Sequence, residues 1–333
     1  MTQALRQPGS AFKPIVYLAA IDGFGYTPAT IVYDSPCTFK VGDELWSPAN
    51  FDEHFLGPIT LRLALEKSRN LVSADIVSRI GVEAPIRYAR LLGIQSKMGK
   101  NLSISLGSSE VTMLELARAY GVLANRGILF DSTFITKISG RDGKLLYDFE
   151  NDRVNRAQQV IKEQSAFILS TMMKGVVEHG TGYRVKELGR PVAGKTGTSN
   201  DQMDTWFVGY TPHWVAGVWV GFDQKRSIGD KETGGRVAAP IWLDFMRSFL
   251  KYDDQRVLER LNAEAQEEAA RLGLEAVAAQ ELPPDDFPIP EGVEPAWINK
   301  HSGTLVDAGQ SGSVTRLLYS RHSTRNRRLG RRG

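Results

Sequence analysis

Two lysines in this sequence lie close to serine or threonine hydroxyls, a combination suited to nucleophilic chemistry. Ser10-Ala11-Phe12-Lys13 places a hydroxyl and an amine three residues apart at the start of an apolar run. If that run is a helix, both side chains lie on one face. A serine attacks only after a base takes its proton, and a lysine serves as the base only when burial or a nearby cation lowers its pKa from about 10.4. Taken alone, the pair is more often a helix-capping serine and a surface lysine.

The second lysine begins Lys195-Thr196-Gly197-Thr198, within a strand-like run. In a regular strand, Lys195 and Gly197 face one way while Thr196 and Thr198 face the other. Gly197 would let the backbone of a substrate come close. A turn rich in glycine and threonine is the alternative interpretation. Between the two lysines, the triplet Ser68-Arg69-Asn70 by itself indicates only the polar end of a helix.

Residues 189–196 also satisfy G-x-x-x-x-G-K-[ST], the phosphate-binding loop of many nucleotide hydrolases. That loop requires a buried strand before it and a helix after it. Here residues 183–188 alternate like a half-exposed strand, and Gly197 and Asn200 lead into further strand-like runs. The context fails on both sides, so the sequence disfavours nucleotide binding and a metal-binding role for Asp223.

Several other kinds of chemistry are excluded by composition. No G-x-S-x-G or H-E-x-x-H string occurs and the five histidines lack ligand-like spacing, so we expect no metal site. Cys37 is the only cysteine and cannot form an internal disulfide. Six arginines and no acidic residue lie in residues 321–333. The net charge of +3 therefore comes from this tail, and the mildly acidic remainder predicts no nucleic-acid surface.

Length and hydropathy restrict the class of protein. The 333 residues are 42% apolar, enough for a full core in one large or two ordinary domains. No run of about 18 uninterrupted apolar residues occurs, and residues 1–10 lack the basic-then-apolar layout of a secretory signal. We therefore expect a soluble chain and leave open that it is a piece of something larger.

The elements that must position the lysines are helical first and richer in strands later. Residues 10–21 are apolar almost all round, which predicts a buried central helix, and residues 22–58 predict a loop. Apolar periods of 3.6 residues predict helices at 59–98 in two or three pieces, 110–126, 163–178 and 237–251. Strand-like runs lie at 130–149, 191–198, 205–211 and 214–222, the last two as an antiparallel hairpin.

Changes in composition divide the chain into four regions. We assign residues 1–250 to a folded domain and residues 251–284 to a charged amphipathic helix. Residues 285–310 would be a proline-rich linker with a short strand, and residues 311–333 a basic, disordered tail.

The order of S-x-x-K, S-x-N and K-T-G on one chain is the set found in penicillin-binding proteins and class A β-lactamases. The sequence resembles the transpeptidase domain of class A, bifunctional penicillin-binding proteins well beyond these triplets. The similarity covers about residues 3–250, with an echo at 287–293. It is carried by RQPGSAFKP, EKSRN, LGSSEVTMLELARAYGVLANRG, MMKGVVEHGTG and AGKTGTSNDQMDTWFVGYTP.

The resemblance implies an α+β, penicilloyl-serine transferase fold in which a helical region and an antiparallel sheet meet at a cleft. Ser10 would open the central helix, Ser68 and Asn70 would lie on an all-helical loop, and residues 195–198 would form the edge strand. Family members carry a membrane anchor, a glycosyltransferase domain and the first strands of the sheet ahead of S-x-x-K, whereas nine residues precede Ser10 here. One face of the central helix and one sheet edge would then lack partners.

The resemblance also implies a D,D-transpeptidase that cross-links peptidoglycan stem peptides ending in D-Ala-D-Ala and is acylated by β-lactams. Ser10 would be the nucleophile, and Lys13, kept neutral by Lys195 and by burial, would be its base. Ser68 would pass a proton to the departing D-alanine, and Asn70 would hold Lys13 and the substrate amide.

Substrate binding and cellular location are implied in the same way. Lys195, Thr196 and Thr198 would bind the terminal carboxylate beside Gly197, and the backbone N–H groups of Ser10 and Thr198 would form the oxyanion hole. Full-length relatives would act at the periplasmic face of the inner membrane, and the resemblance implies that no metal or cofactor is needed.

Two alternatives stay open. A serine β-lactamase needs an acid, in the form E-x-x-L-N before K-T-G, to activate the deacylating water. No such string lies between Asn70 and Lys195, and Arg69 replaces the aspartate usual in that triplet. The other alternative is a truncated, non-catalytic remnant in which the site residues are present but inactive.

Overall fold

A computed structural model describes residues 3–272, 279, 282, 285–299, 302–306 and 314–320. Its helical segments are η1 (Gly9–Phe12), α1 (Lys13–Leu18), η2 (Ala19–Gly23), α2 (Leu61–Glu66), α3 (Asn70–Ile80), α4 (Glu83–Leu91), η3 (Leu102–Leu106), α5 (Met113–Ala124), α6 (Phe149–Arg156), α7 (Glu163–Glu178), η4 (Tyr183–Leu188), η5 (Asn200–Gln202) and α8 (Ala238–Leu272). Its strands are β1 (Ile31–Asp34), β2 (Phe39–Val41), β3 (Glu44–Trp46), β4 (Gly57–Thr60), β5 (Ile128–Leu129), β6 (Lys137–Ser139), β7 (Leu145–Asp148), β8 (Gln158–Gln159), β9 (Ala193–Thr198), β10 (Asp204–Tyr210), β11 (Val215–Gly221), β12 (Val293–Asn299) and β13 (Val314–Ser320).

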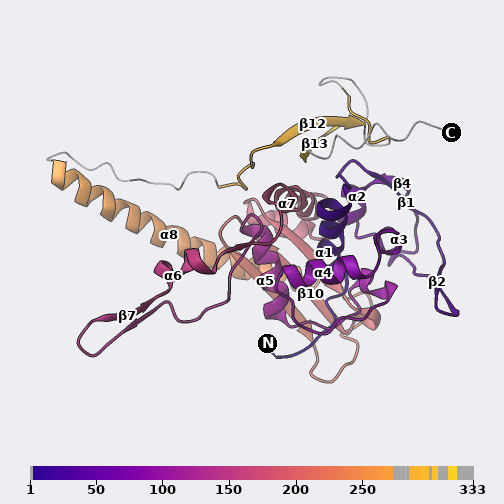
Figure 1. Cartoon of the computed structure of the whole chain (residues 1–333), viewed down its shortest axis with the longest axis horizontal. Coiled ribbons are helices and arrows are strands. Elements are labelled where there is room, and N and C mark those ends of the chain that lie inside the picture. Colours follow the sequence, from indigo (N-terminus) through magenta and orange to yellow (C-terminus); the bar gives the residue numbers. More distant parts are fainter. Residues whose placement is uncertain are drawn as a thin grey trace.

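The central helix is formed by η1, α1 and η2, which follow one another without a break. Every residue from Ala11 to Ile21 is buried, as the apolar sequence predicted. Helices α2, α3, α4 and α7 all contact α1 (Figure 1). The expectation that one face of this helix would lack partners is therefore wrong, because the surrounding helices cover it.

The sheet beside this helix has three antiparallel strands in the order β11-β10-β9. Strand β10 is buried along its whole length and sends alternate side chains to two cores. Trp206 and Val208 pack into the larger core with α1, α5 and α7, whereas Phe207 lies edge-on to Trp242 of α8, 5.2 Å between ring centroids. Strand β9 is an edge strand, as expected. In the described part of the chain, β11 pairs only with β10, so the predicted open edge is present.

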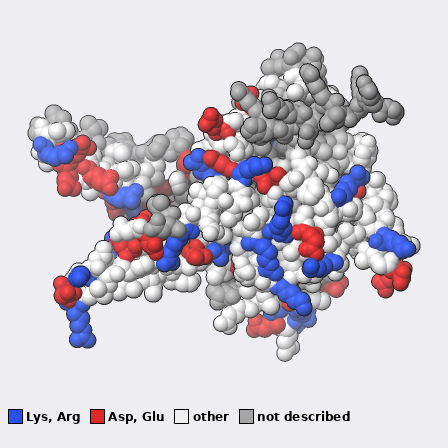
Figure 2. Space-filling model, viewed as in Figure 1, with Lys and Arg blue, Asp and Glu red and all other residues white. Residues whose placement is uncertain are grey.

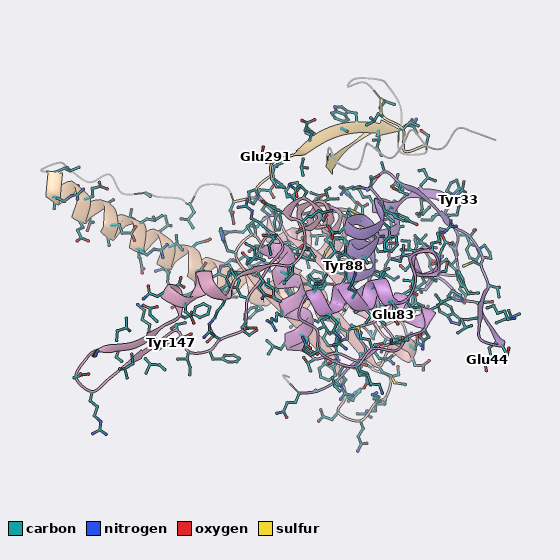
Figure 3. The ribbon with its side chains drawn as sticks, in the orientation of Figure 1. Tyr33, Glu44, Glu83, Tyr88, Tyr147 and Glu291 are labelled. Carbon is teal, nitrogen blue, oxygen red and sulfur yellow. The ribbon has the colours of Figure 1, made fainter. Side chains whose placement is uncertain are left out.

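Residues 31–58 differ from the sequence prediction, which assigned residues 22–58 to a loop. Strands β1 and β4 pair antiparallel, from Ile31 opposite Thr60 to Asp34 opposite Gly57. Between them β2 and β3 form a second hairpin, whose tip at Glu44 projects from the body (Figure 3). The local pattern does not show these strands, because they are three or four residues long and β1 pairs with a segment more than twenty residues away.

Helices elsewhere lie close to their predicted places. The run 59–98 forms three helices, broken at Ser68 and at Gly81, and α7 covers the predicted 163–178. Helix α5 begins with a capping box, in which Thr112 and Glu115 each accept from the other's backbone N–H. The expected turn in residues 130–149 joins β6 to β7, and Tyr147 marks this hairpin in Figure 3.

The C-terminal third differs most from the predictions. One helix, α8, replaces the separate helices expected at 237–251 and within 251–284, because no helix-breaking residue separates them. The proposed boundary at residue 250 falls inside this helix (Figure 1). Strand β12 pairs with β13, so residues 314–320 are not the disordered chain that was expected. Residues 273–278 and the arginine-rich 321–333 lie outside the described residues.

The visible surface carries charges of both signs, interspersed over the body and along α8 (Figure 2). Within the described ranges, none of the helices combines the length and the hydropathy that crossing a bilayer requires.

Candidate active site

Ser10 lies in η1 at the opening of the central helix and is partly exposed. Among the described residues, no hydrogen-bond partner is found for its hydroxyl, and Pro8 rather than Ser10 is the N-cap. Lys13, one turn later, is fully buried. The interpretation as a capping serine followed by a surface lysine is therefore wrong.

The Lys13 amine reaches the turn between α2 and α3. Its Nζ lies 2.6 Å from the carbonyl oxygen of Ser68, 2.6 Å from Asn70 Oδ1 and 3.2 Å from Ser68 Oγ. Burial, then the charge of Lys195, then the charge of Arg69 hold the pKa of Lys13 well below its ordinary value. A lowered pKa makes it easier for this amine to lose its charge, which a lysine must do before it can accept a proton.

A second buried amine approaches the same hydroxyl from the sheet. Lys195 is fully buried, and its Nζ donates to Ser68 Oγ at 2.9 Å. Burial lowers the pKa of Lys195 to about 7. Ser68 Oγ thus lies between two amines, one from α1 and one from β9. A hydroxyl in this position can receive a proton from one side and deliver it on the other.

Successive residues of β9 point to opposite faces of the strand, as predicted from the sequence. Lys195 and Gly197 face the helical side: a Cβ on Gly197 would lie 2.2 Å from the carbonyl oxygen of Pro8. On the other face, Thr196 Oγ1 lies 2.6 Å from Thr181 Oγ1, and Thr198 Oγ1 accepts from the Gly234 N–H at 3.2 Å. The alternative interpretation of these residues as a turn is wrong.

The start of the central helix and the end of β9 touch through their backbones. Gly9 has a φ of +53°, and a Cβ there would lie 2.2 Å from the carbonyl oxygen of Thr198. Only glycine tolerates both conditions. On its other side, Gly9 N donates to the carbonyl oxygen of Gly107 at 3.2 Å. The close contact brings the peptide units around Ser10 and Thr198 next to each other.

The structure thus brings Lys13, Ser68, Asn70 and Lys195 together, with Ser10 at the opening of the central helix and residues 196–198 along the adjoining strand. Thr181 and Gly234 belong to the same region and were not singled out from the sequence. The glycine-rich strings HGTG and TGG were the available signal, since glycines indicate close backbone approach. Asp34 and Asn50, which contact this region through Arg69 and Asn70, carried no such signal.

The other candidate chemistries do not fit this geometry. The segment 189–196 is followed by the remainder of β9 and not by a full helix, and its lysine is buried against Ser68, so the phosphate-binding loop is excluded. Within the described residues, no group of three side chains suits a metal ion. No carboxylate of the described chain hydrogen-bonds to the side chains of Ser10, Lys13 or Ser68.

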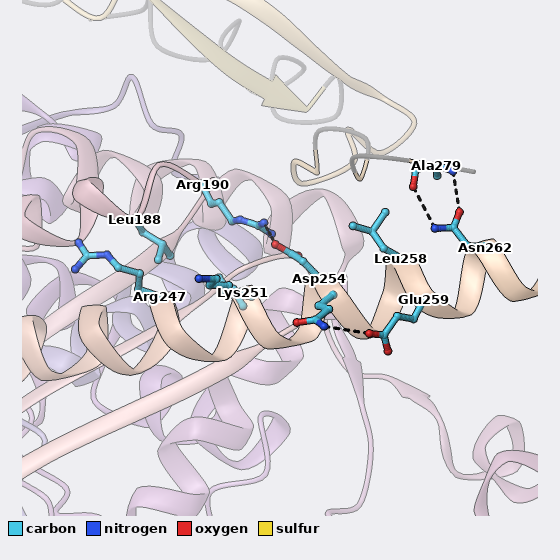
Figure 4. A pocket seen from close by; sticks show the side chains of 11 residues that line it. Leu188, Arg190, Arg247, Lys251, Asp254, Leu258, Glu259, Asn262 and Ala279 are labelled. Carbon is cyan, nitrogen blue, oxygen red and sulfur yellow. Dashed lines mark hydrogen bonds and ion pairs between the residues drawn. The ribbon is translucent and has the colours of Figure 1, made fainter. Parts of the chain in front are cut away.

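A hollow of about 480 Å³ lies elsewhere, between η4 and α8 (Figure 4). Arg190 and Asp254 pair across it, and Asn262 bonds the backbone of Ala279. None of the predicted site residues lines this hollow.

Comparison with known proteins identifies the family. Residues 1–247 match the penicillin binding protein transpeptidase domain. Penicillin-binding protein 1A of Rickettsia bellii (strain RML369-C) is 34% identical over 330 residues, which cover 93% of this chain and 38% of that protein. Penicillin-binding protein 1A of Neisseria gonorrhoeae is 43% identical over 255 residues, 75% of this chain and 32% of that protein. The chain thus spans about a third of the length of these relatives.

Solved structures show the same fold. The crystal structure of penicillin-binding protein 1A from Haemophilus influenzae has a TM-score of 0.80 at 24% identity and covers 97% of this chain and 49% of that one. The PonA1 protein from Mycobacterium tuberculosis, in complex with penicillin V, has a TM-score of 0.66 at 26% identity, covering 75% of this chain and 70% of that one. The predicted penicilloyl-serine transferase fold is confirmed, and the chain belongs to the penicillin-binding protein transpeptidase family.

Proposed function

We propose that this chain is a D,D-transpeptidase that cross-links peptidoglycan stem peptides through an acyl ester on Ser10, and that penicillin forms the same kind of ester there. The observation that carries the proposal is Ser68 Oγ lying 3.2 Å from one buried amine and 2.9 Å from another, next to a helix that opens at a partly exposed serine. The family supports the reaction class. The assignment to individual residues rests on this geometry.

In the first half-reaction, Lys13 takes the proton of the Ser10 hydroxyl as Oγ bonds to the carbonyl carbon between the two terminal D-alanines. The developing negative charge on the carbonyl oxygen faces the backbone N–H groups of Ser10 and Thr198. Such a donor is worth roughly 3–4 kcal/mol in comparable enzymes. The proton then passes through Ser68 to the amine of the last D-alanine as the C–N bond breaks.

In the second half-reaction, an amine from a neighbouring stem peptide attacks the ester. The bond to Ser10 breaks, and the proton lost by the amine returns to Ser10 through Lys13. Asn70 uses its Oδ1 for Lys13 and one Nδ2 hydrogen for the carbonyl of Ala49, which leaves its other hydrogen for the substrate amide. Lys195 and Thr198 would hold the terminal carboxylate.

The same geometry favours a lasting penicillin adduct over turnover. A β-lactamase of this kind uses a carboxylate to activate the deacylating water, and no described carboxylate hydrogen-bonds to the side chains of Ser10, Lys13 or Ser68. We infer that deacylation is slow and that the chain is not a β-lactamase. Peptidoglycan as substrate places the activity outside the cytoplasm, at the periplasmic side in relatives with an inner membrane.

Mass spectrometry of the penicillin-treated chain tests the proposal. We expect a mass increase equal to intact penicillin, mapped to the peptide that contains Ser10. The increase should be absent in Ser10→Ala and unchanged in Ser227→Ala, which alters an exposed serine. An adduct on another residue contradicts the mechanism, and rapid release of hydrolysed drug favours the β-lactamase. A folded chain that forms no adduct is the non-catalytic remnant.

A further inference from the structure

The turn that presents Ser68 and Asn70 is not fixed by its own sequence. Ser68 has a φ of +56°, a backbone conformation that non-glycine residues rarely adopt. Helix α3 begins at Asn70, and its N-cap residue, Arg69, makes no capping side-chain hydrogen bond. Both features cost stability unless other parts of the molecule compensate.

Asn50, twenty residues earlier, provides the missing cap. Its Oδ1 accepts from the backbone N–H of Asn70 at 2.8 Å and of Leu71 at 3.5 Å. Its Nδ2 donates to Asp34 Oδ1 at 2.7 Å. The neighbouring Ala49 carbonyl accepts from Asn70 Nδ2 at 2.8 Å, which orients the Asn70 amide so that its Oδ1 meets Lys13.

Arg69 ties the same turn to β1. Its Nε donates to Asp34 Oδ2 at 2.7 Å, with the arginine side chain 5% exposed and the aspartate fully buried. The rest of the guanidinium bonds Asp52, at 2.8 Å, and the carbonyl oxygen of His54. A buried pair with this many satisfied groups fixes geometry, and the loss of one partner leaves an uncompensated buried charge.

We propose that Asp34, Asn50 and Arg69, which we call the brace, are positioning residues for the acylation of Ser10: they hold Ser68 and Asn70 against Lys13 and set the charge around it. The inference rests on the proposed function, because Lys13 is there the base.

The charges around Lys13 give the brace an electrostatic signature. Lys195 approaches from β9, Arg69 from the α2–α3 turn and Asp34 from β1, while Asp52 pairs with the outer side of Arg69. Burial and Lys195 lower the pKa of Lys13 most; Arg69 lowers it further and Asp34 raises it. Acylation requires neutral Lys13, so its rate falls as pH drops through this pKa. Removing the Arg69 charge should move that fall to higher pH, and removing the Asp34 charge should move it to lower pH.

The test is the rate of penicillin acylation as a function of pH in single variants. We expect rates on the order of ten to a hundred times lower than wild type in Arg69→Gln, Asp34→Asn and Asn50→Ala, since small displacements of catalytic groups cost this much. The pH at which the acylation rate falls on the acidic side of the pH–rate profile, which we call the acidic limb, should be higher than in wild type in Arg69→Gln and lower in Asp34→Asn. In Asn50→Ala it should be unchanged. Arg69→Lys keeps the positive charge but loses the simultaneous contacts of the guanidinium with Asp34, Asp52 and the carbonyl oxygen of His54. This variant should therefore be acylated slowly, with its acidic limb at the same pH as in wild type.

Arg79→Gln is the matched control, because Arg79 lies on α3 in an exposed pair with Asp75. This variant should leave both the acylation rate and the pH of its acidic limb unchanged. The proposal would be overturned if the folded brace variants were acylated at the wild-type rate. It would also be overturned if their acidic limbs all moved to the same side of the wild-type pH. If Asp34→Asn does not fold, Asn50→Ala and Arg69→Lys decide the outcome.

If the wild-type chain forms no penicillin adduct, the proposed function is rejected and acylation rates no longer test the brace. A structural measurement then tests the brace. In a crystal structure of Asn50→Ala, the distance from Lys13 Nζ to Asn70 Oδ1 should exceed hydrogen-bond range. If it stays at the 2.6 Å of the wild type, Asn50 does not position Asn70 and the inference fails.

Discussion

The two walls of the active site are held in place in different ways. The helical wall, with Ser68 and Asn70, depends on side-chain hydrogen bonds and a buried ion pair from residues far away in the sequence. The strand wall, residues 195–198, depends on the backbone ladder to β10 and on glycines packed against backbone. The helical wall should therefore respond to changes of charge, and the strand wall to changes in the size of its residues.

The largest effect should come from adding one methyl group to the strand wall. In Gly197→Ala, the new Cβ would lie 2.2 Å from the Pro8 carbonyl oxygen and 3.0 Å from the Cβ atoms of Ala11 and Trp206. Backbone atoms must move, and such overpacking costs roughly 1–3 kcal/mol or more. We expect no penicillin labelling and a lowered thermal midpoint.

Gly121→Ala is its control, because a Cβ at this helical position meets nothing nearer than 3.9 Å. It should retain labelling and keep or raise the thermal midpoint, as alanine favours a helix by up to about 1 kcal/mol. If Gly197→Ala keeps its labelling and thermal midpoint as Gly121→Ala does, the strand wall does not depend on the small size of its residues.

The second prediction tests charge on the strand wall itself. Lys195→Met should abolish labelling while keeping the fold. The pKa of Lys195 is about 7 in the folded chain and about 10.4 when unfolded. Between these values the unfolded chain holds a proton that the folded chain lacks, so this residue makes stability rise with pH. Thermal midpoints measured from pH 7 to 9 should rise more steeply in wild type than in the variant; equal slopes contradict the buried neutral amine.

The smallest effect should come from a contact at the start of the central helix, away from the charges of the helical wall. Tyr120 donates its buried hydroxyl to the carbonyl oxygen of Ala11 at 2.7 Å. In Tyr120→Phe this carbonyl loses a partner, at a cost of about 1–2 kcal/mol. We expect a modestly lower thermal midpoint and a labelling rate within a few-fold of wild type. Complete loss of labelling would show that the site depends on the exact position of the central helix as strongly as on the size of residues in the strand wall.

Much of the fold was predictable because its patterns are local. The apolar period gave α7 within the observed bounds, and alternation gave the hairpin of β10 and β11. The order of the three triplets predicted the family, which is confirmed, and the site residues remain a proposal that the geometry supports. Neither Asp34 nor Asn50 was predictable, since each acts on a partner 20 or more residues away, through a segment whose pattern indicated only a loop.

The segment after α8 has a practical consequence for making this protein. Phe287 is 8% exposed and lies edge-on to Tyr210, 5.6 Å between ring centroids, while Asp286 pairs with Lys174 of α7. A recombinant version ended where the match to the family model stops, at residue 247, would uncover the buried ring of Tyr210 and leave Lys174 without its counterion. Expression trials should therefore retain the chain through at least residue 306 to avoid aggregation.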